Sequence, residues 1–369
     1  MQRQLGIHIA DMTRCSSATA PGAASIPRRL MLWTSKPLIQ AFSSNVRELH
    51  GVSNRGITHG NMVDAANATP TRYDQLLRCP KIQRRLQHQT PMHTHSSNCS
   101  SAVAPNVTIS RRNNDTGGRI ATITVSHPAK LNIVSSLVLD KLILACAELS
   151  IESNLRAVVL EGGDTVQGKS PAFIGGADIK EMNQLSSSKE AETFISRIHH
   201  ACKALHDLPT PVIARIDGYC LGAGLEIAAA CDLRIATERS VFGMPEVNVG
   251  IPSVVEAALL PGLIGMGRTR RLLYLAENIN AVTAERWGLV ERLVDSRQEL
   301  DDAVTEWVTR IAKTGPHAMT SQKRLTQTWE NVPVDDGITA GVKAFSECYD
   351  DGGQEPKSFM EAFTSRRRS

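Results

Sequence analysis

The sequence predicts an α/β domain that continues into a series of helices and is preceded by a long extension. Between about residues 107 and 253, short apolar runs typical of buried strands alternate with apolar stripes at helical spacing. After residue 253 helical spacing dominates. Residues 1–105 show neither period and are rich in Ser, Thr, Asn, Gln, His and Arg. We therefore expect a basic N-terminal extension of low order over 1–105, an α/β core over 106–260, and a C-terminal helical region of the same domain over 261–369.

The first elements of the core show the clearest patterns. Residues 120–125 alternate as a strand does, with Ala121, Ile123 and Val125 on one face. The next apolar residues follow helical spacing, and a serine at 135 or 136 is placed to cap that helix. Further strands are expected at 156–160, 211–216 and 231–236, and helices at 190–205 and 224–230.

The C-terminal region is expected to be almost entirely helical. Its apolar residues recur at helical spacing in residues 267–276, 281–287, 300–312, 317–329 and 337–349. No stretch of about 18 or more apolar residues occurs in the chain, so we expect no membrane span.

The N-terminal extension carries the positive charge of the chain. Residues 1–100 hold twelve Lys or Arg against four Asp or Glu, although the whole chain has a net charge of only +4. The remainder is therefore slightly acidic, and we expect no specific binding of nucleic acid there. Residues 1–47 contain a single acid among spaced arginines, a composition typical of an organelle transit peptide. A disordered tail is the alternative interpretation.

Two further features bear on localisation. The eight cysteines include no Cys-x-x-Cys pair, and Cys146 and Cys231 lie in apolar segments, so a reducing compartment is expected. The chain ends in Ser365-Arg-Arg-Arg-Ser369 and not in the Ser-Lys-Leu signal of peroxisomal proteins. We expect a mitochondrial protein, with the cytosol or the peroxisome as alternatives.

A first glycine-rich turn lies within residues 170–182. Gly175 and Gly176 allow the backbone to turn tightly, and Asp178 can cap a helix that begins at Ile179. A turn that leads into a helix N-terminus aims unpaired N–H groups at one point and favours negative charge there. The alternative is a tight turn without a further role.

A second glycine-rich turn lies within residues 217–227 and follows a predicted strand. Gly222, Ala223 and Gly224 are expected to expose backbone N–H groups at the start of an apolar helix. Glu226 lies about one turn further along that helix. An acid at this position can also simply stabilise the helix dipole.

A second carboxylate stands in an apolar run broken by glycine and proline. Glu246 is the only acid in residues 241–252, where it is either solvated in a loop or partly desolvated with a raised pKa. Two donor turns and two carboxylates together are the components of an oxyanion hole with an acid and a base.

These segments, taken in order, resemble the crotonase (enoyl-CoA hydratase/isomerase) superfamily, from about residue 107 to the C-terminus. The segments are Phe-x-x-Gly-Ala-Asp-Ile-Lys at 173–180, Gly-Tyr-x-Leu-Gly-x-Gly-x-Glu at 218–226, Cys-Asp-Leu-Arg-Ile-Ala at 231–236, and Phe-Gly-x-Pro-Glu at 242–246. The resemblance implies a crotonase-like spiral of ββα units with a C-terminal helical region that trimerises. It therefore implies a homotrimer or a hexamer.

The resemblance also implies roles for individual residues. The N–H groups of Ala177 and Ala223 would hold the thioester oxygen of an acyl-CoA substrate, and Glu226 and Glu246 would be the catalytic glutamates. Lys130 lies in the segment that is similar to the family's early CoA-contacting loop. The other substrate-binding residues implied are Gly175, Gly176, Asp178, Ile179 and Gly222.

The activity implied is that of an enoyl-CoA hydratase, which adds water across the 2,3 double bond of an enoyl-CoA thioester. A base activates water at C3, an acid protonates C2, and the two N–H groups stabilise the intervening enolate. This chemistry requires no metal and no redox cofactor, and CoA is part of the substrate. An acyl-CoA dehydratase would run the reaction in reverse.

Other functions fit some of the same features. An enoyl-CoA delta-isomerase uses the same enolate but needs one carboxylate, so the presence of both glutamates favours the hydratase. Residues 253–261 depart from the glycine-rich turn of many hydratases, which leaves the acyl chain open. A dinucleotide-binding turn would need a third glycine where Ile227 stands. A non-catalytic CoA- or RNA-binding scaffold is disfavoured, because the helix that is lysine-rich in RNA-binding relatives carries only Lys141 here.

Overall fold

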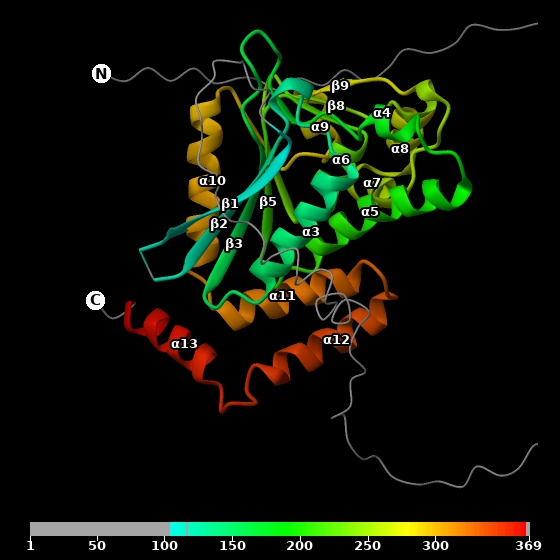
Figure 1. Cartoon of the computed structure of the whole chain (residues 1–369). Helices are drawn as coiled ribbons and strands as arrows, with labels where there is room; N and C mark the ends of the chain where they lie inside the picture. Colours follow the sequence, from blue (N-terminus) through cyan, green and yellow to red (C-terminus); the bar gives the residue numbers. More distant parts are fainter. Residues whose placement is uncertain (1–103, 116, 367–369) are drawn as a thin grey trace, which may run out of the picture. The chain divides into compact units, whose positions relative to one another are not determined.

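The computed structural model describes residues 104–115 and 117–366, which belong to one compact unit. Nearly all of the predicted N-terminal extension, with its expected transit peptide, lies outside the described residues. The strands within the described range form two sheets (Figure 1).

The larger sheet has six strands, and all but one run parallel to their neighbours. The first, β1, is antiparallel to β2, and the remaining pairs are parallel. In spatial order the strands are β1 (Asn106–Asn113), β2 (Arg119–Ser126), β3 (Leu155–Gly162), β5 (Val212–Ile216), β7 (Leu233–Thr237) and β10 (Arg292–Val294).

The smaller sheet is built from very short strands. In spatial order they are β4 (Ala172–Ile174), β6 (Tyr219–Leu221), β8 (Val241–Gly243) and β9 (Ile279–Asn280). The first three are parallel to one another, and β9 is antiparallel to β8. A strand of two or three residues has no detectable period, and none of these four is among the strands that the sequence predicts.

The two sheets are connected by a repeated ββα arrangement. Three consecutive pairs, β3–β4, β5–β6 and β7–β8, each place one strand in the larger sheet and the next in the smaller sheet. Helices follow each pair: α4 (Ile179–Met182) and α5 (Ser188–His206), then α6 (Ala223–Ala229), then α7 (Leu260–Ile264) and α8 (Met266–Leu275). The predicted spiral of ββα units is thereby confirmed.

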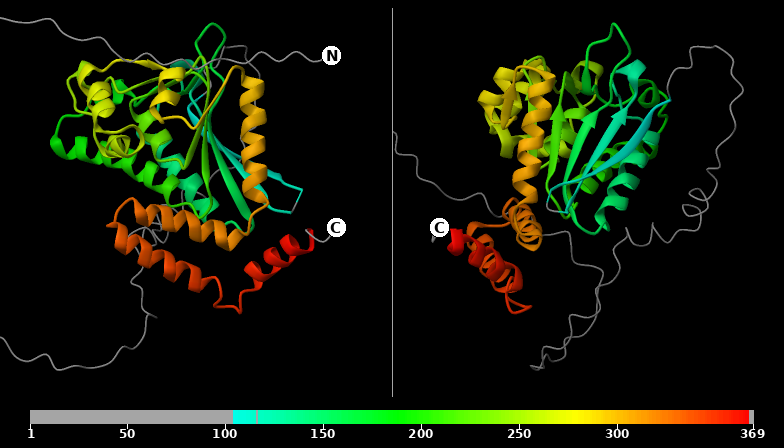
Figure 2. Two further views of the ribbon diagram at one scale, coloured as in Figure 1. Left: turned by 180° about the vertical axis from the view of Figure 1, so that it is seen from behind. Right: turned by 90° about the vertical axis from the view of Figure 1, so that its left-hand side faces the viewer.

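Helices cover both faces of the larger sheet (Figure 2). In β3, Val158 and Leu160 face the core formed with α5 and with α3 (Ser136–Ser150), whereas Ala157 and Val159 face α10 (Arg297–Ala312). Alternate residues of a strand point to opposite faces, so a strand with apolar residues at every position is buried on both. The expected cap of α3 is confirmed, because the side chain of Ser135 accepts a hydrogen bond from the N–H of Val138.

The C-terminal region is helical, as expected, apart from the two short strands β9 and β10. Its further helices are α9 (Ala281–Trp287), α11 (Pro316–Trp329), α12 (Val334–Glu347) and α13 (Gln354–Arg366). The last of these is absent from the sequence prediction. Its Glu355 carboxylate accepts hydrogen bonds from the N–H groups of His317 (3.1 Å) and Ala318 (2.9 Å), which are free at the start of α11. No helix within the described ranges is long and apolar enough to cross a bilayer.

Candidate active site

The three predicted site segments meet at one edge of the smaller sheet. Strands β4, β6 and β8 are parallel neighbours, so their carboxyl ends lie at the same edge. Each strand is followed at once by a predicted segment: residues 175–177 after β4, 222–223 after β6 and 245–246 after β8. Ligands of α/β proteins commonly bind outside the carboxyl ends of parallel strands. The fold therefore gathers donor groups and a carboxylate that are far apart in the sequence.

The N–H group of Ala177 points away from the strand beside it. The carbonyl of Gly176 accepts a hydrogen bond from the N–H of Val134, and the N–H of Asp178 donates to the carbonyl of Val134, both at 2.9 Å. In an extended chain, the backbone N–H and C=O groups of successive residues point alternately to opposite sides. Gly176 and Asp178 direct theirs toward Val134, so Ala177 directs its own to the other side. The Ala177 N–H is thus left on the opposite side, as an oxyanion donor requires.

The N–H group of Ala223 is free for a different reason. Ala223 is the first residue of α6, and the first N–H groups of a helix have no partner within it. The start of α6 is pressed against β4, because a Cβ atom added at Gly224 would collide with the carbonyl of Ile174. The turn at Gly176 is close too, since its added Cβ would lie 3.5 Å from the carbonyl of Leu221. The two donor turns are therefore adjacent.

Two of the predicted substrate-binding glycines have backbone N–H groups that are already engaged. The N–H of Gly222 bonds to the carbonyl of Gly243, and the N–H of Gly175 bonds to the carbonyl of Leu131, each at 2.9 Å. The expectation that Gly222 exposes its N–H is therefore wrong. These glycines shape the turns: Gly222 has a φ of +50°, and a Cβ at Gly175 would come within 2.9 Å of the Leu131 carbonyl.

Glu226 projects from α6 into the interior and is only 4% exposed. Burial raises the pKa of its carboxyl group, and the nearby carboxylates of Glu246 and Glu256 raise it further, to about 8, although the N–H of Ala257 opposes the shift. Burial disfavours the charged form of an acid, and a like charge nearby disfavours it too. Glu226 therefore holds a proton at neutral pH.

Glu246 lies in a different environment. It begins the short 3₁₀ helix η2 (Glu246–Val249), is half-buried, and accepts a hydrogen bond from the Ser253 hydroxyl at 2.8 Å. Its other carboxylate oxygen lies against Gly222, where an added Cβ would collide with it. The absence of a side chain at Gly222 thus allows Glu246 to approach the start of α6. The two glutamates differ in burial and in partners, as an acid and a base must.

Lys130 and Asp178 form an ion pair at the rim of this region. The Lys130 ammonium lies 3.1 Å from Asp178, whose second oxygen accepts from the N–H of Lys180 and so caps α4 as expected. Burial alone would raise the pKa of Asp178, but Lys130 and the N–H of Lys180 outweigh it and hold that pKa below its usual value. The side chain of Lys130 remains 39% exposed and Ile179 is exposed.

A third glutamate belongs to this cluster and is absent from the sequence prediction. Glu256 lies in η3 (Val255–Leu259), is 9% exposed, and contributes to the raised pKa of Glu226. The signal was present in the sequence, because Glu256 is the only charged residue in the apolar run 254–260. Nothing in that run indicates, however, that it packs against α6.

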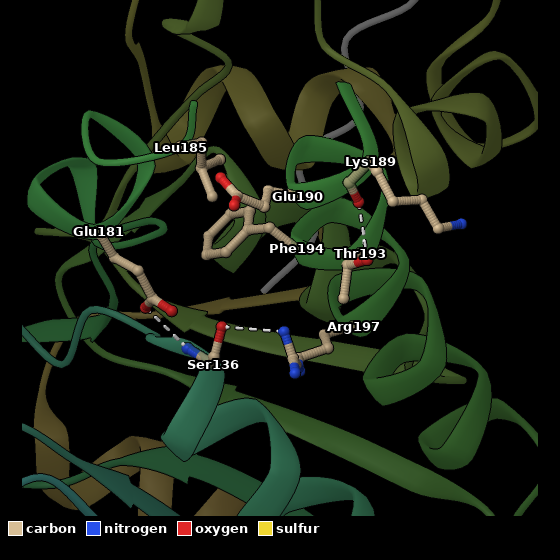
Figure 3. A pocket seen from close by; sticks show the side chains of 8 residues that line it. All are labelled: Ser136, Glu181, Leu185, Lys189, Glu190, Thr193, Phe194 and Arg197. Carbon is tan, nitrogen blue, oxygen red and sulfur yellow. Dashed lines mark hydrogen bonds between the residues drawn. The ribbon is translucent and has the colours of Figure 1, made fainter. Parts of the chain in front are cut away.

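A pocket of about 210 Å³ lies beside the site, between α3, α4 and α5 (Figure 3). None of the predicted site residues lines it. Its wall includes Glu181, which accepts a hydrogen bond from the N–H of Ser136 at 2.9 Å and so fastens α4 to the start of α3. Since α4 directly follows the Ala177 turn, this contact helps to hold that turn in place. No group of three or more His, Cys, Asp or Glu residues within 104–115 and 117–366 could hold a metal ion.

The fold and the site together define an α/β protein with two backbone donors and paired glutamates at a sheet edge. A family model described as enoyl-CoA hydratase/isomerase matches residues 115–368. The chain belongs to this enoyl-CoA hydratase/isomerase family.

Individual relatives agree with this assignment. The chain is 32% identical over 252 residues to a short-chain-enoyl-CoA hydratase of Clostridium acetobutylicum, covering 68% of this chain and 93% of the relative. It is 28% identical over 252 residues to a protein of Dictyostelium discoideum named probable enoyl-CoA hydratase, mitochondrial, covering 68% of this chain and 86% of the relative. The crystal structure of an enoyl-CoA hydratase from Bacillus anthracis superposes with a TM-score of 0.63 at 28% identity, covering 71% of this chain and 96% of that one.

Proposed function

We propose that the protein is an enoyl-CoA hydratase, which adds water across the 2,3 double bond of an enoyl-CoA thioester. The observation that carries the proposal is the pairing of Glu226 and Glu246, in contrasting environments, beside the backbone donors Ala177 and Ala223. The hydratases among its relatives support the same reaction.

The backbone donors act on the thioester carbonyl. Attack of water at C3 moves negative charge onto the thioester oxygen. The N–H groups of Ala177 and Ala223 would stabilise that charge by donating hydrogen bonds to the oxygen. Each such donor contributes about 3–4 kcal/mol to stabilising the transition state. The donors belong to a strand end and a helix start, so they need no rearrangement when the charge develops.

The glutamates act on the water and on C2. Glu226 carries a proton at neutral pH and can deliver it to C2, since its pKa is raised to about 8. Glu246, oriented by Ser253, can take a proton from the attacking water. The pair keeps one proton in total, but that proton starts on Glu226 and ends on Glu246, so it must return to Glu226 before the next turnover.

Turnover on a panel of enoyl-CoA esters tests the proposal. The panel varies the chain length and sets 2-enoyl against 3-enoyl esters. Hydration of 2-enoyl esters at a higher kcat/KM than conversion of 3-enoyl esters supports the hydratase. Faster movement of the double bond identifies the isomerase, the closest rival. No turnover on any ester, with CoA still bound, leaves only a binding scaffold.

We also propose that the protein assembles as a homotrimer or hexamer. One face of α12 is apolar and exposed, with Val334, Ile338, Val342 and Phe345 each more than 60% exposed. These residues recur every three or four positions, so they share one side of the helix. An exposed apolar patch of this kind marks an interaction surface. Light scattering of the purified protein tests this, with Val342→Glu as the variant expected to dissociate; a monomeric wild type at micromolar concentration contradicts it.

We propose a mitochondrial location for the protein. Support comes from the arginine-rich, acid-poor composition of residues 1–47 and from the relative whose name includes that compartment. Fusion of residues 1–50 to a fluorescent reporter tests the proposal. Import into mitochondria is expected, and a cytosolic reporter contradicts it.

A further inference from the structure

Glu256 is held in an unusual state for a carboxylate. One oxygen lies 2.6 Å from Nδ1 of His199, on α5, whose ring reaches the surface. The other oxygen is buried and makes no hydrogen bond of ordinary geometry among the described residues, although the Cys202 thiol lies close enough to interact with the carboxylate. A buried acceptor without a full hydrogen bond is unfavourable, and more so when it is charged. Its position therefore calls for a physical explanation.

The backbone next to Glu256 is also strained. Val255 adopts a φ of +39°, in a region that β-branched residues rarely enter. Backbone strain of this kind is unfavourable and is concentrated at functional sites. Two unfavourable features thus occur at consecutive residues of η3.

The inward side of Glu256 faces the proposed active site. The segment η3 packs against both α5 and α6. On α6 it interacts with the carboxyl group of Glu226, and on α5, besides His199, with the buried thiol of Cys202. Burial raises the pKa of the Cys202 thiol well above its usual value, and the charges of Glu256 and Glu226 raise it further. The three groups therefore form one buried cluster.

We propose that Glu256 is a positioning residue for the hydration reaction, whose buried negative charge, oriented by His199, keeps the proton on Glu226. This inference rests on the proposed function, since it assigns Glu256 a task in the acid step of that reaction. Glu256 itself does not touch the reacting atoms.

The surroundings of Glu226 are consistent with this role. It faces Glu246 from η2, Glu256 and the N–H of Ala257 from η3, and Cys202 from α5. No Lys, Arg or His forms an ion pair with Glu226 in the part of the chain that the structure describes. Removal of the charge of Glu256 therefore removes a repulsion that no nearby cation balances.

The competing interpretation is purely structural, with Glu256 and His199 only joining η3 to α5. The two differ in the pH dependence of kcat. If Glu226 must be protonated, activity is lost as the pH rises through its pKa. A negative neighbour raises that pKa, so Glu256→Gln must move the alkaline limb of kcat to lower pH. If Glu256 and His199 only join η3 to α5, weakening their contact lowers kcat or stability but leaves the alkaline limb of kcat at the same pH.

The experiment compares the kcat–pH profiles of wild type, Glu256→Gln and Glu256→Asp. We expect Glu256→Gln to move the alkaline limb down by at least about one pH unit with KM little changed. Glu256→Asp keeps the charge and should restore most of the shift. Glu192→Gln, an exposed acid on the same helix as His199, is the matched control and should leave the limb in place. An unmoved limb in folded Glu256→Gln overturns the inference.

A second measurement needs no turnover. Infrared difference spectra across a pH titration detect the protonated carboxyl group, and the band absent from Glu226→Gln belongs to Glu226. In Glu256→Gln that band should vanish at lower pH than in wild type, and an identical midpoint overturns the inference. If the wild type hydrates no ester but the midpoint shifts, the proposed function fails and the coupling of the two glutamates stands. Should Glu256→Gln not fold, Glu256→Asp decides, because a limb or midpoint that falls by about one unit although the negative charge is kept contradicts the inference.

Discussion

The ammonium group of Lys323, on α11, lies 2.8 Å from the carboxylate of Asp232, 91 residues earlier in the chain. Lys323 is 5% exposed and also donates to the carbonyl of Thr210. The same oxygen of Asp232 accepts from the N–H of Val212, at the start of β5. This contact ties the first of the last three helices to the loops that begin two strands of the larger sheet.

Loss of this ammonium should destabilise the fold. Lys323→Met leaves Asp232 without its cation, and breaking such a pair on one side costs about 3 kcal/mol when it is largely buried. Urea unfolding measures the loss. Lys189→Met is the control, because its ion pair with Glu192 is exposed and such pairs contribute less than about 1 kcal/mol. Equal stability of the two variants would contradict the importance of this contact.

The paired glutamates predict a non-additive loss of activity. Glu226→Gln and Glu246→Gln should each lower kcat by about 10²–10⁴, with KM little changed, because an amide keeps the shape but cannot transfer the proton. The double variant should lose far less than the product of the single losses, since both residues take part in one addition of water. Steady-state kinetics on a 2-enoyl-CoA measures this. If only one of the two substitutions lowers kcat, and the protein shifts the double bond faster than it hydrates it, the protein is an isomerase.

The raised pKa of Glu226 predicts that stability falls as the pH increases. Between its ordinary value of 4.5 and about 8, the folded protein holds a proton that the unfolded chain has released. The contribution is therefore fully present below pH 4.5 and lost as the pH rises through 8. Glu226→Gln lacks this dependence, so it should be more stable than wild type by on the order of 3–5 kcal/mol at pH 9. Urea unfolding of the wild type and of Glu226→Gln at pH 4.5 and at pH 9 tests this. A difference in the free energy of unfolding that is the same at both pH values would refute it.

The structure predicts that position 222 tolerates no side chain. Its φ of +50° disfavours any L residue, and an added Cβ collides with the carboxylate of Glu246. Gly222→Ala should lower kcat at least about tenfold by displacing Glu246, and should reduce stability by about 1–2 kcal/mol. Gly262→Ala is the matched control, because Gly262 lies in α7 with open space at its Cβ. Full activity in Gly222→Ala would contradict this prediction, because it would show that Glu246 can shift away from the added Cβ without loss of function.

Lys130 is expected to act on binding and not on the chemical step. An ammonium group suits phosphate as a point charge, so Lys130→Ala should raise KM for the acyl-CoA far more than it lowers kcat. The same change removes the partner of Asp178, which caps α4. Asp178→Asn therefore serves as the comparison. Equal KM effects in both variants assign the ion pair a structural role, and an unchanged KM in Lys130→Ala removes it from the CoA site.

The sequence predicts those parts of the fold whose signals are local. Helix α3 with its cap Ser135, the cap Asp178 and the four central strands β2, β3, β5 and β7 each have a local signal, whereas the outer strands β1 and β10 are absent from the sequence prediction. The smaller sheet carries none, because its strands are two or three residues long and are set by their neighbours. The segments at 175–177 and 222–223 were identified as turns, but their adjacency depends on this unpredicted sheet.

The site shows the same division. Glu226 and Glu246 stand out as acids in apolar surroundings, whereas the contribution of Glu256 depends on the packing of η3 against α6, which no local pattern specifies. The engaged N–H of Gly222 is a similar case. Its partner, Gly243, lies 21 positions away on β8 and becomes a neighbour only when the short strands pair.

The two proposed oxyanion donors, Ala177 and Ala223, are main-chain groups of residues with the smallest side chain that still has a Cβ. Neither carries any reactive atom in its side chain, and alanine scanning would leave both untouched. Only a change in the path of the chain, or a proline that deletes the N–H, can remove them. A survey of reactive side chains would therefore find the two glutamates and overlook the two backbone N–H groups, which are half of the groups assigned to the chemical step. In this part of the molecule, the path of the main chain, and not a reactive side chain, places the groups assigned to the thioester oxygen.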